Sequence, residues 1–158
     1  MQTEDGATRW GTVDLALHGD GVGQRLMRFA DWLMGECMNY ALREIWCEQV
    51  WIDRNTHQQT ARVLFGIQSL AEMKAARNSL GFHLVKPTEW RRHFLGPLPR
   101  GTRRRDFKRL ACERCRVLGY DIKTDDEADA LGILDYALAR AKVASLTGAG
   151  PLFVDGAR

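Results

Sequence analysis

The stretch TDDEADALGILDY, residues 124–136, places four acids within five positions and then continues as an apolar helical pattern. A helix that starts near Thr124 puts Asp126 and Asp129 three residues apart, on one face. Two carboxylates directed the same way at a helix end suit a hard cation such as Mg²⁺. The same letters form a capping box between Thr124 and Glu127, with acids that complement the helix dipole. Both interpretations stay open from this stretch alone.

A further acid, Glu48, lies in the apolar run Arg43–Trp51, which predicts a buried strand. A carboxylate inside a sheet is costly to bury unless it is paired or bound to a metal. The alternative is that Glu48 lies at the end of the strand, where water reaches it. The sequence by itself does not choose between these two interpretations.

Length and composition indicate one soluble globular domain. The chain has 158 residues, of which 45% are hydrophobic and 27% are charged. The sequence contains neither an apolar run of membrane-spanning length nor a secretory leader pattern, so we expect a cytoplasmic protein without a membrane partner. Cys112 and Cys115 form a C-x-x-C pair without a second pair at zinc-ligand spacing, which favours buried free thiols. Residues 147–158 are expected to form a loose tail.

The net charge is only +3, but its distribution is uneven. Between Arg91 and Arg109 there are eight basic residues against one acid, Asp106, whereas six acids stand between Asp121 and Asp135. A basic patch beside an acidic cluster suits a phosphate-backbone ligand together with a metal held by the acids. The alternative is a solvated basic loop.

Periodicity and turn residues predict an α/β order of elements. The expected strands are Trp10–Leu17, Arg43–Trp51 and Phe82–Lys86. The expected helices are Gly23–Leu42, Asn55–Leu80, Pro87–Leu95, Asp106–Leu118 and about Asp126–Ala144. Residues 1–9 are expected to be a hairpin loop. The pattern predicts a small sheet with helices on its faces.

Three motifs follow in order between residues 10 and 140. IWCEQV (45–50) has Glu then Gln on the strand after the first long helix, VKPTEWRRHFL (85–95) leads into the basic segment, and DEADAL (126–131) has the form D-x-x-D-A-L. In this combination the chain resembles RuvC-type Holliday-junction resolvases, especially phage-type members, within the ribonuclease H-like superfamily. The resemblance implies a ribonuclease H-like mixed sheet flanked by helices.

The resemblance also implies a chemistry. Glu48, Asp126 and Asp129 would be the catalytic residues and the ligands of two Mg²⁺ or Mn²⁺ ions that flank a scissile phosphate in branched DNA. The DNA-binding residues would be basic side chains, since phosphate contacts orient DNA without reading its sequence. They are Arg91, Arg92, Arg103, Arg104, Arg105 and Lys108. Resolvases of this kind are usually dimers, and the apolar helices Gly23–Leu42 and Asn55–Leu80 could form an isologous interface.

The chain departs from the family at its start, because the first one or two strands and their Asp are missing. Three explanations are open. The true protein extends upstream, which we favour; the chain is an inactive copy; or Trp10–Leu17 takes the central position in the sheet and Asp14 replaces the missing acid. The leading hypothesis is a metal-dependent endonuclease that resolves Holliday junctions. The alternatives are a non-catalytic DNA-binding module and a structural domain whose acids only cap a helix.

Overall fold

The computed structural model describes the backbone of residues 8–146 and the side chains of residues 8–143. The elements follow in the order α1 (Val22–Asn39), β1 (Glu44–Glu48), α2 (Gln58–Arg77), β2 (Gly81–Val85), α3 (Pro87–Leu95), α4 (Arg104–Val117) and α5 (Asp125–Leu146). The α/β fold class and all five predicted helices are confirmed, with ends that shift by a few residues. The hairpin loop expected at residues 1–9 falls mostly outside the described residues, and the tail at 147–158 falls wholly outside them.

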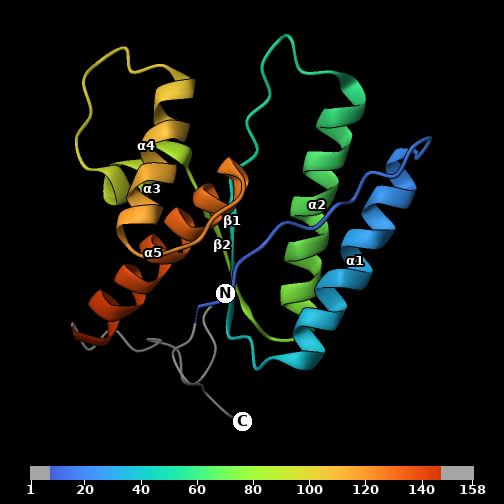
Figure 1. Cartoon of the computed structure of the whole chain (residues 1–158). Helices are drawn as coiled ribbons and strands as arrows, with labels where there is room; N and C mark the ends of the chain where they lie inside the picture. Colours follow the sequence, from blue (N-terminus) through green and yellow to red (C-terminus); the bar gives the residue numbers. More distant parts are fainter. Residues whose placement is uncertain (1–7, 147–158) are drawn as a thin grey trace.

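The described sheet consists of two parallel strands. β1 and β2 pair in register from Glu44 opposite Gly81 to Glu48 opposite Val85. α2 connects them, as a parallel pair requires a crossover of this length. The sheet stands between two groups of helices, with α1 and α2 on one side and α3, α4 and α5 on the other (Figure 1). We call these groups the α1–α2 layer and the α3–α5 layer.

The strand predicted over Trp10–Leu17 is wrong. Residues 9–17 belong to no strand, and their backbone groups bond to nearby side chains instead of a ladder. Ala16 N donates to Asp14 Oδ1 at 2.8 Å, and Arg28 Nη1 donates to Leu15 O at 2.9 Å. Without a neighbouring strand, an alternating apolar pattern alone does not make a sheet edge. The proposed move of this segment into the sheet, with Asp14 as the replacement acid, is therefore wrong as well.

The main core lies within the α3–α5 layer. Trp90 and Cys115 are completely buried, and they pack with Phe94, Ala111, Ala128 and Leu131. Small residues on α5 allow this close packing: a Cβ atom on Gly132 would lie 2.6 Å from Cζ3 of Trp90. The core therefore fixes how α3 and α5 lie against each other, and so where their polar residues lie.

The α1–α2 layer is packed more thinly. Its buried residues are Leu33, Ala71 and Ala75. Many of its large apolar side chains are exposed, among them Met27, Trp32, Met34, Met38, Phe65 and Met73. Among the described residues, none of the helices is both long enough and apolar enough to span a membrane.

The prediction of buried free thiols for the C-x-x-C pair is confirmed for Cys115, whereas Cys112 is only partly buried. Cys37, Cys47, Cys112 and Cys115 are all free thiols. Burial raises the pKa of Cys47, on β1, and of Cys115, on α4, to about 11. The C-x-x-C pair is thus a helical pair of thiols, one of them packed in the core.

Candidate functional site

Glu48 lies at the carboxyl end of β1, next to the start of α3. Beyond it the ladder ends with Gln49 N, which donates to Val85 O at 2.8 Å. The indole Nε1 of Trp90, on α3, donates to Glu48 Oε1 at 3.2 Å. The structure thus combines the two interpretations of this residue, because Glu48 ends its strand and is also only partly exposed. Ligand sites in open α/β sheets lie at this edge.

The start of α5 is a capping box. Thr124 Oγ1 accepts from Glu127 N at 3.2 Å, and Glu127 Oε2 accepts from Lys123 N at 2.6 Å. Thr12 Oγ1 adds a bond to Glu127 Oε1 at 3.4 Å, and the Glu127 residue is only 6% exposed. The capping interpretation is therefore confirmed for Thr124 and Glu127. It leaves the other acids of the stretch for another role.

Asp129 approaches Glu48 from the second turn of α5. One guanidinium nitrogen of Arg91, Nη2, lies 3.6 Å from Glu48 Oε1 and 3.8 Å from Asp129 Oδ2. Burial raises the pKa of Asp129 to about 6; Arg91 opposes that rise and Glu48 adds to it. Glu48 and Asp129, which we call the carboxylate pair, therefore converge on one cation.

Asp126 does not join this pair. It is exposed, whereas its neighbour Asp125 is hydrogen-bonded to Lys108 on α4. That bond lowers the pKa of Asp125 and raises the pKa of Lys108. Asp125 is four residues before Asp129, so helical spacing alone allows either Asp125 or Asp126 to share its face. The hydrogen bond from Lys108 shows that Asp125, not Asp126, faces α4. The sequence pattern did not identify Asp125 as a candidate site residue.

The donor set suits a divalent ion only in part. Carboxylate oxygens are the ligands that Mg²⁺ and Mn²⁺ prefer. Within residues 8–146, however, no three or more His, Cys, Asp or Glu side chains are grouped to hold a metal. The position between Glu48 and Asp129 is instead approached by the guanidinium of Arg91.

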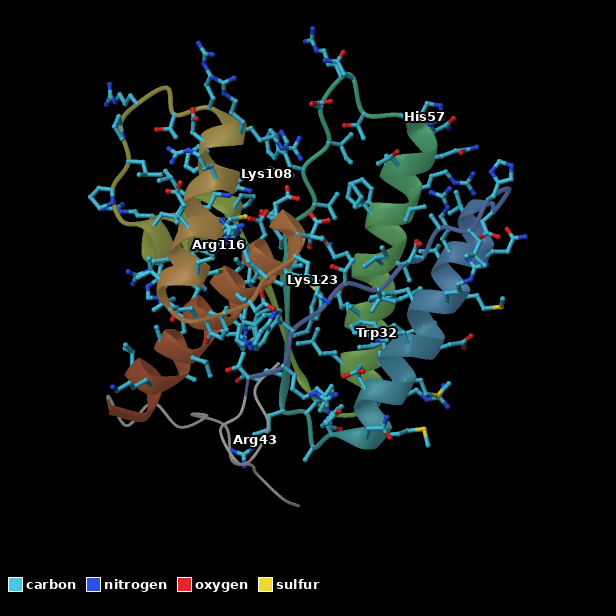
Figure 2. All side chains as sticks on the ribbon, viewed as in Figure 1. Trp32, Arg43, His57, Lys108, Arg116 and Lys123 are labelled. Atoms are coloured by element: carbon cyan, nitrogen blue, oxygen red, sulfur yellow. The ribbon has the colours of Figure 1, made fainter. Side chains whose placement is uncertain are left out.

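The basic residues gather at the same end of the molecule. The loops at 49–57 and 96–103 both rise beyond the carboxyl ends of the strands (Figure 1). Figure 2 shows Lys108 on α4 at this end. Arg103, Arg104 and Arg105 are exposed around the start of α4, and Arg92 is exposed on α3. Of the predicted DNA-binding residues, Arg91 is the one that turns inward to the carboxylate pair.

No protein-family model matches the chain, and no curated protein matches it. The function is therefore inferred from the arrangement of these side chains.

Proposed function

We propose that this chain is a metal-dependent endonuclease of branched DNA, with a ribonuclease H-like fold, that resolves four-way junctions. The observation that carries the proposal is the carboxylate pair. Two acids from distant parts of the chain, on β1 and α5, converge on one cation position at the carboxyl end of a parallel sheet. This is the edge where α/β folds bind ligands.

Glu48 and Asp129 would hold Mg²⁺ or Mn²⁺, and Asp126 is the third ligand that the sequence proposes. Such an ion lowers the pKa of bound water and stabilises the leaving oxygen of a phosphodiester. The chain's own contribution is to orient these oxygens. Trp90 holds Glu48 by its indole hydrogen bond, and the capping box fixes the first turn of α5, one turn before Asp129.

The basic end of the molecule would bind the DNA backbone. Arg103, Arg104 and Arg105 are exposed around the start of α4, and Lys108 follows one turn later. Lysine and arginine contacts to phosphate release counterions, so binding through them weakens steeply as salt rises. We expect junction binding to lose affinity with added salt, and to lose part of that dependence in an Arg104→Ala, Arg105→Ala variant.

A cleavage assay tests the proposal. A labelled four-way junction is incubated with the chain and Mg²⁺ or Mn²⁺, beside the Glu48→Gln and Asp129→Asn variants. We expect each variant to lose cutting by about 100-fold or more, as for other residues that act on the transition state. Asp135→Asn is the matched control, because Asp135 lies on the same helix but pairs with His93. Equal cutting by wild type and both carboxylate variants would remove Glu48 and Asp129 from the mechanism.

The second candidate is a non-catalytic junction-binding module. The position of Arg91 favours it, since a guanidinium already lies between Glu48 and Asp129. This candidate predicts junction binding that needs no divalent ion, and no cutting by any variant. A gel-shift titration with EDTA beside the cleavage assay separates the two candidates.

Cutting two opposed strands needs two sites, so we also propose a homodimer. The exposed apolar side chains of α1 and α2 are the surface that supports it. An isologous pair would place this surface against its own copy. Sedimentation equilibrium across a concentration series tests this proposal directly.

A further inference from the structure

We propose that Arg91 is an internal cation of the carboxylate pair, which a divalent ion must displace before it can bind. The inference rests on the proposed function for the identity of that ion. It adds a regulatory role: the affinity of the site for metal is set by how readily this one side chain leaves.

The distances fit a cation that is attracted but not locked in place. Arg91 Nη2 lies 3.6 Å from Glu48 Oε1 and 3.8 Å from Asp129 Oδ2. Both separations exceed the length of a good hydrogen bond, so the attraction is mainly electrostatic. The Nε atom of Arg91 is buried and has no hydrogen-bond partner among the described residues. A guanidinium held by two short bidentate pairs would be far harder to remove.

Aromatic rings keep Arg91 beside the pair. Its guanidinium carbon lies 5.0 Å from the ring centroid of Trp90 and 5.5 Å from that of Phe107. Such cation–π contacts hold a charged group without binding it in a fixed direction. Arginine remains protonated at any working pH, so it leaves the site only by moving. Its position on α3 tethers it close to the site after it leaves.

Charge explains why the two cations exclude each other. Glu48 and Asp129 carry two negative charges when ionised, and Arg91 balances one of them. A divalent ion at the same position would stand within a few ångströms of the guanidinium, where like charges repel strongly in a partly buried site. Removing the guanidinium takes away the positive charge beside the two carboxylates, and a metal ion can then occupy its place.

The test compares Mn²⁺ binding to wild type, Arg91→Met and Arg92→Met by titration calorimetry and by electron paramagnetic resonance of free Mn²⁺. Both variants lose one positive charge from the same helix, but Arg92 is exposed and, within the described part of the chain, forms no ion pair with Glu48 or Asp129. We expect Arg91→Met to bind Mn²⁺ about ten-fold or more tighter than wild type, and Arg92→Met to stay within about two-fold. Equal affinities for the two variants would overturn the proposal.

Two further measurements test where the ion binds and allow for a variant that does not fold. Adding Asp129→Asn to Arg91→Met should abolish the gained affinity; retention of that affinity would overturn the proposal, because the ion would then lie elsewhere. If Arg91→Met does not fold by circular dichroism, Arg91→Gln and Arg92→Gln replace the two variants. The rise in melting temperature with Mn²⁺ is then measured. A larger rise for Arg91→Gln supports the proposal, and an equal or smaller rise overturns it.

These outcomes are independent of the cleavage assay. Tighter Mn²⁺ binding by Arg91→Met without cutting by any form would uphold the internal cation and reject the nuclease. Metal-dependent cutting by wild type, with unchanged Mn²⁺ affinity in Arg91→Met, would uphold the nuclease and reject the internal cation.

Discussion

The two helical layers use their apolar residues differently. In the α3–α5 layer, Trp90 is completely buried and α5 approaches it through Gly132. In the α1–α2 layer, Trp32 is 40% exposed and Met38 is 80% exposed, although both helices are long and rich in apolar residues. The carboxylate pair lies between the sheet and the tightly packed layer. The α3–α5 layer thus holds the site in place, whereas the α1–α2 layer presents an exposed apolar surface.

The largest expected difference between the layers is in the cost of removing an indole. Trp90→Ala should lower the free energy of unfolding by about 3–5 kcal/mol, because it opens a cavity in a closed core. Trp32→Ala, the matched change in the other layer, should cost about 1 kcal/mol because Trp32 is already partly in water. Urea denaturation measures both. Equal costs would mean that the α1–α2 layer is covered in solution.

Each layer contains a helical glycine that is packed closely against a side chain. A Cβ on Gly132 would press on the buried rings of Trp90 and Phe94, so Gly132→Ala should cost about 2 kcal/mol. A Cβ on Gly66, in α2, would meet the side chain of Leu26, which is only partly buried. Gly66→Ala also gains about 1 kcal/mol of helix propensity, so its net effect should be near zero. Thermal unfolding of the two variants decides; a large loss for Gly66→Ala would show that Leu26 has no room to move.

Asp129 lies beside the α3–α5 layer, and its ionisation should make the free energy of unfolding depend on pH. The pKa of Asp129 in the folded chain, about 6, lies above the ordinary 3.8. Its favourable contribution is therefore complete below about pH 4 and is lost as pH rises through 6. Relative to wild type, Asp129→Asn should gain about 1 kcal/mol of stability between pH 4 and pH 7, after allowance for solvent screening. Urea denaturation at pH 4 and at pH 7 measures this change in the stability difference, and Asp135→Asn is the control for removing an acid from the same helix. Parallel pH profiles for wild type and Asp129→Asn would contradict the raised pKa.

The exposed surface of α1 should contribute little to the stability of a monomer. Met38→Gln should change the free energy of unfolding by less than about 0.5 kcal/mol, because a side chain in water contributes little packing. Unfolding followed at two protein concentrations checks this value. A loss above about 1 kcal/mol that grows with concentration would show that a second copy covers this surface.

Much of the fold follows from local pattern. All five helices were predictable because apolar spacing, Pro87 at the start of α3 and the Thr124–Glu127 box are local signals. The predicted strand at Trp10–Leu17 failed because a strand needs a partner, and the alternating pattern does not say whether one is present. The bonds from Asp14 and Arg28 to that segment are not visible in the sequence.

The candidate site was predictable only in part. Glu48 was recognisable as an acid in an apolar strand, and Asp129 as an acid on a helix face; the structure brings both to Arg91. The choice of Asp125 over Asp126 as the neighbour of Lys108 depends on how α4 packs on α5, which periodicity does not fix. Arg91 was expected to face DNA, yet its guanidinium lies over the rings of Trp90 and Phe107, a contact that the sequence pattern does not show.

Cys47 and Cys115 can report on local opening of the protein through their rates of alkylation. Cys47 lies in the sheet and Cys115 in the core of the α3–α5 layer, and burial keeps the pKa of each near 11. Alkylating reagents attack the thiolate, so at neutral pH both thiols react very slowly while their surroundings stay closed. Each becomes reactive when its own region opens. The order in which the two are modified would record, without any engineered label, which part of the protein opens first.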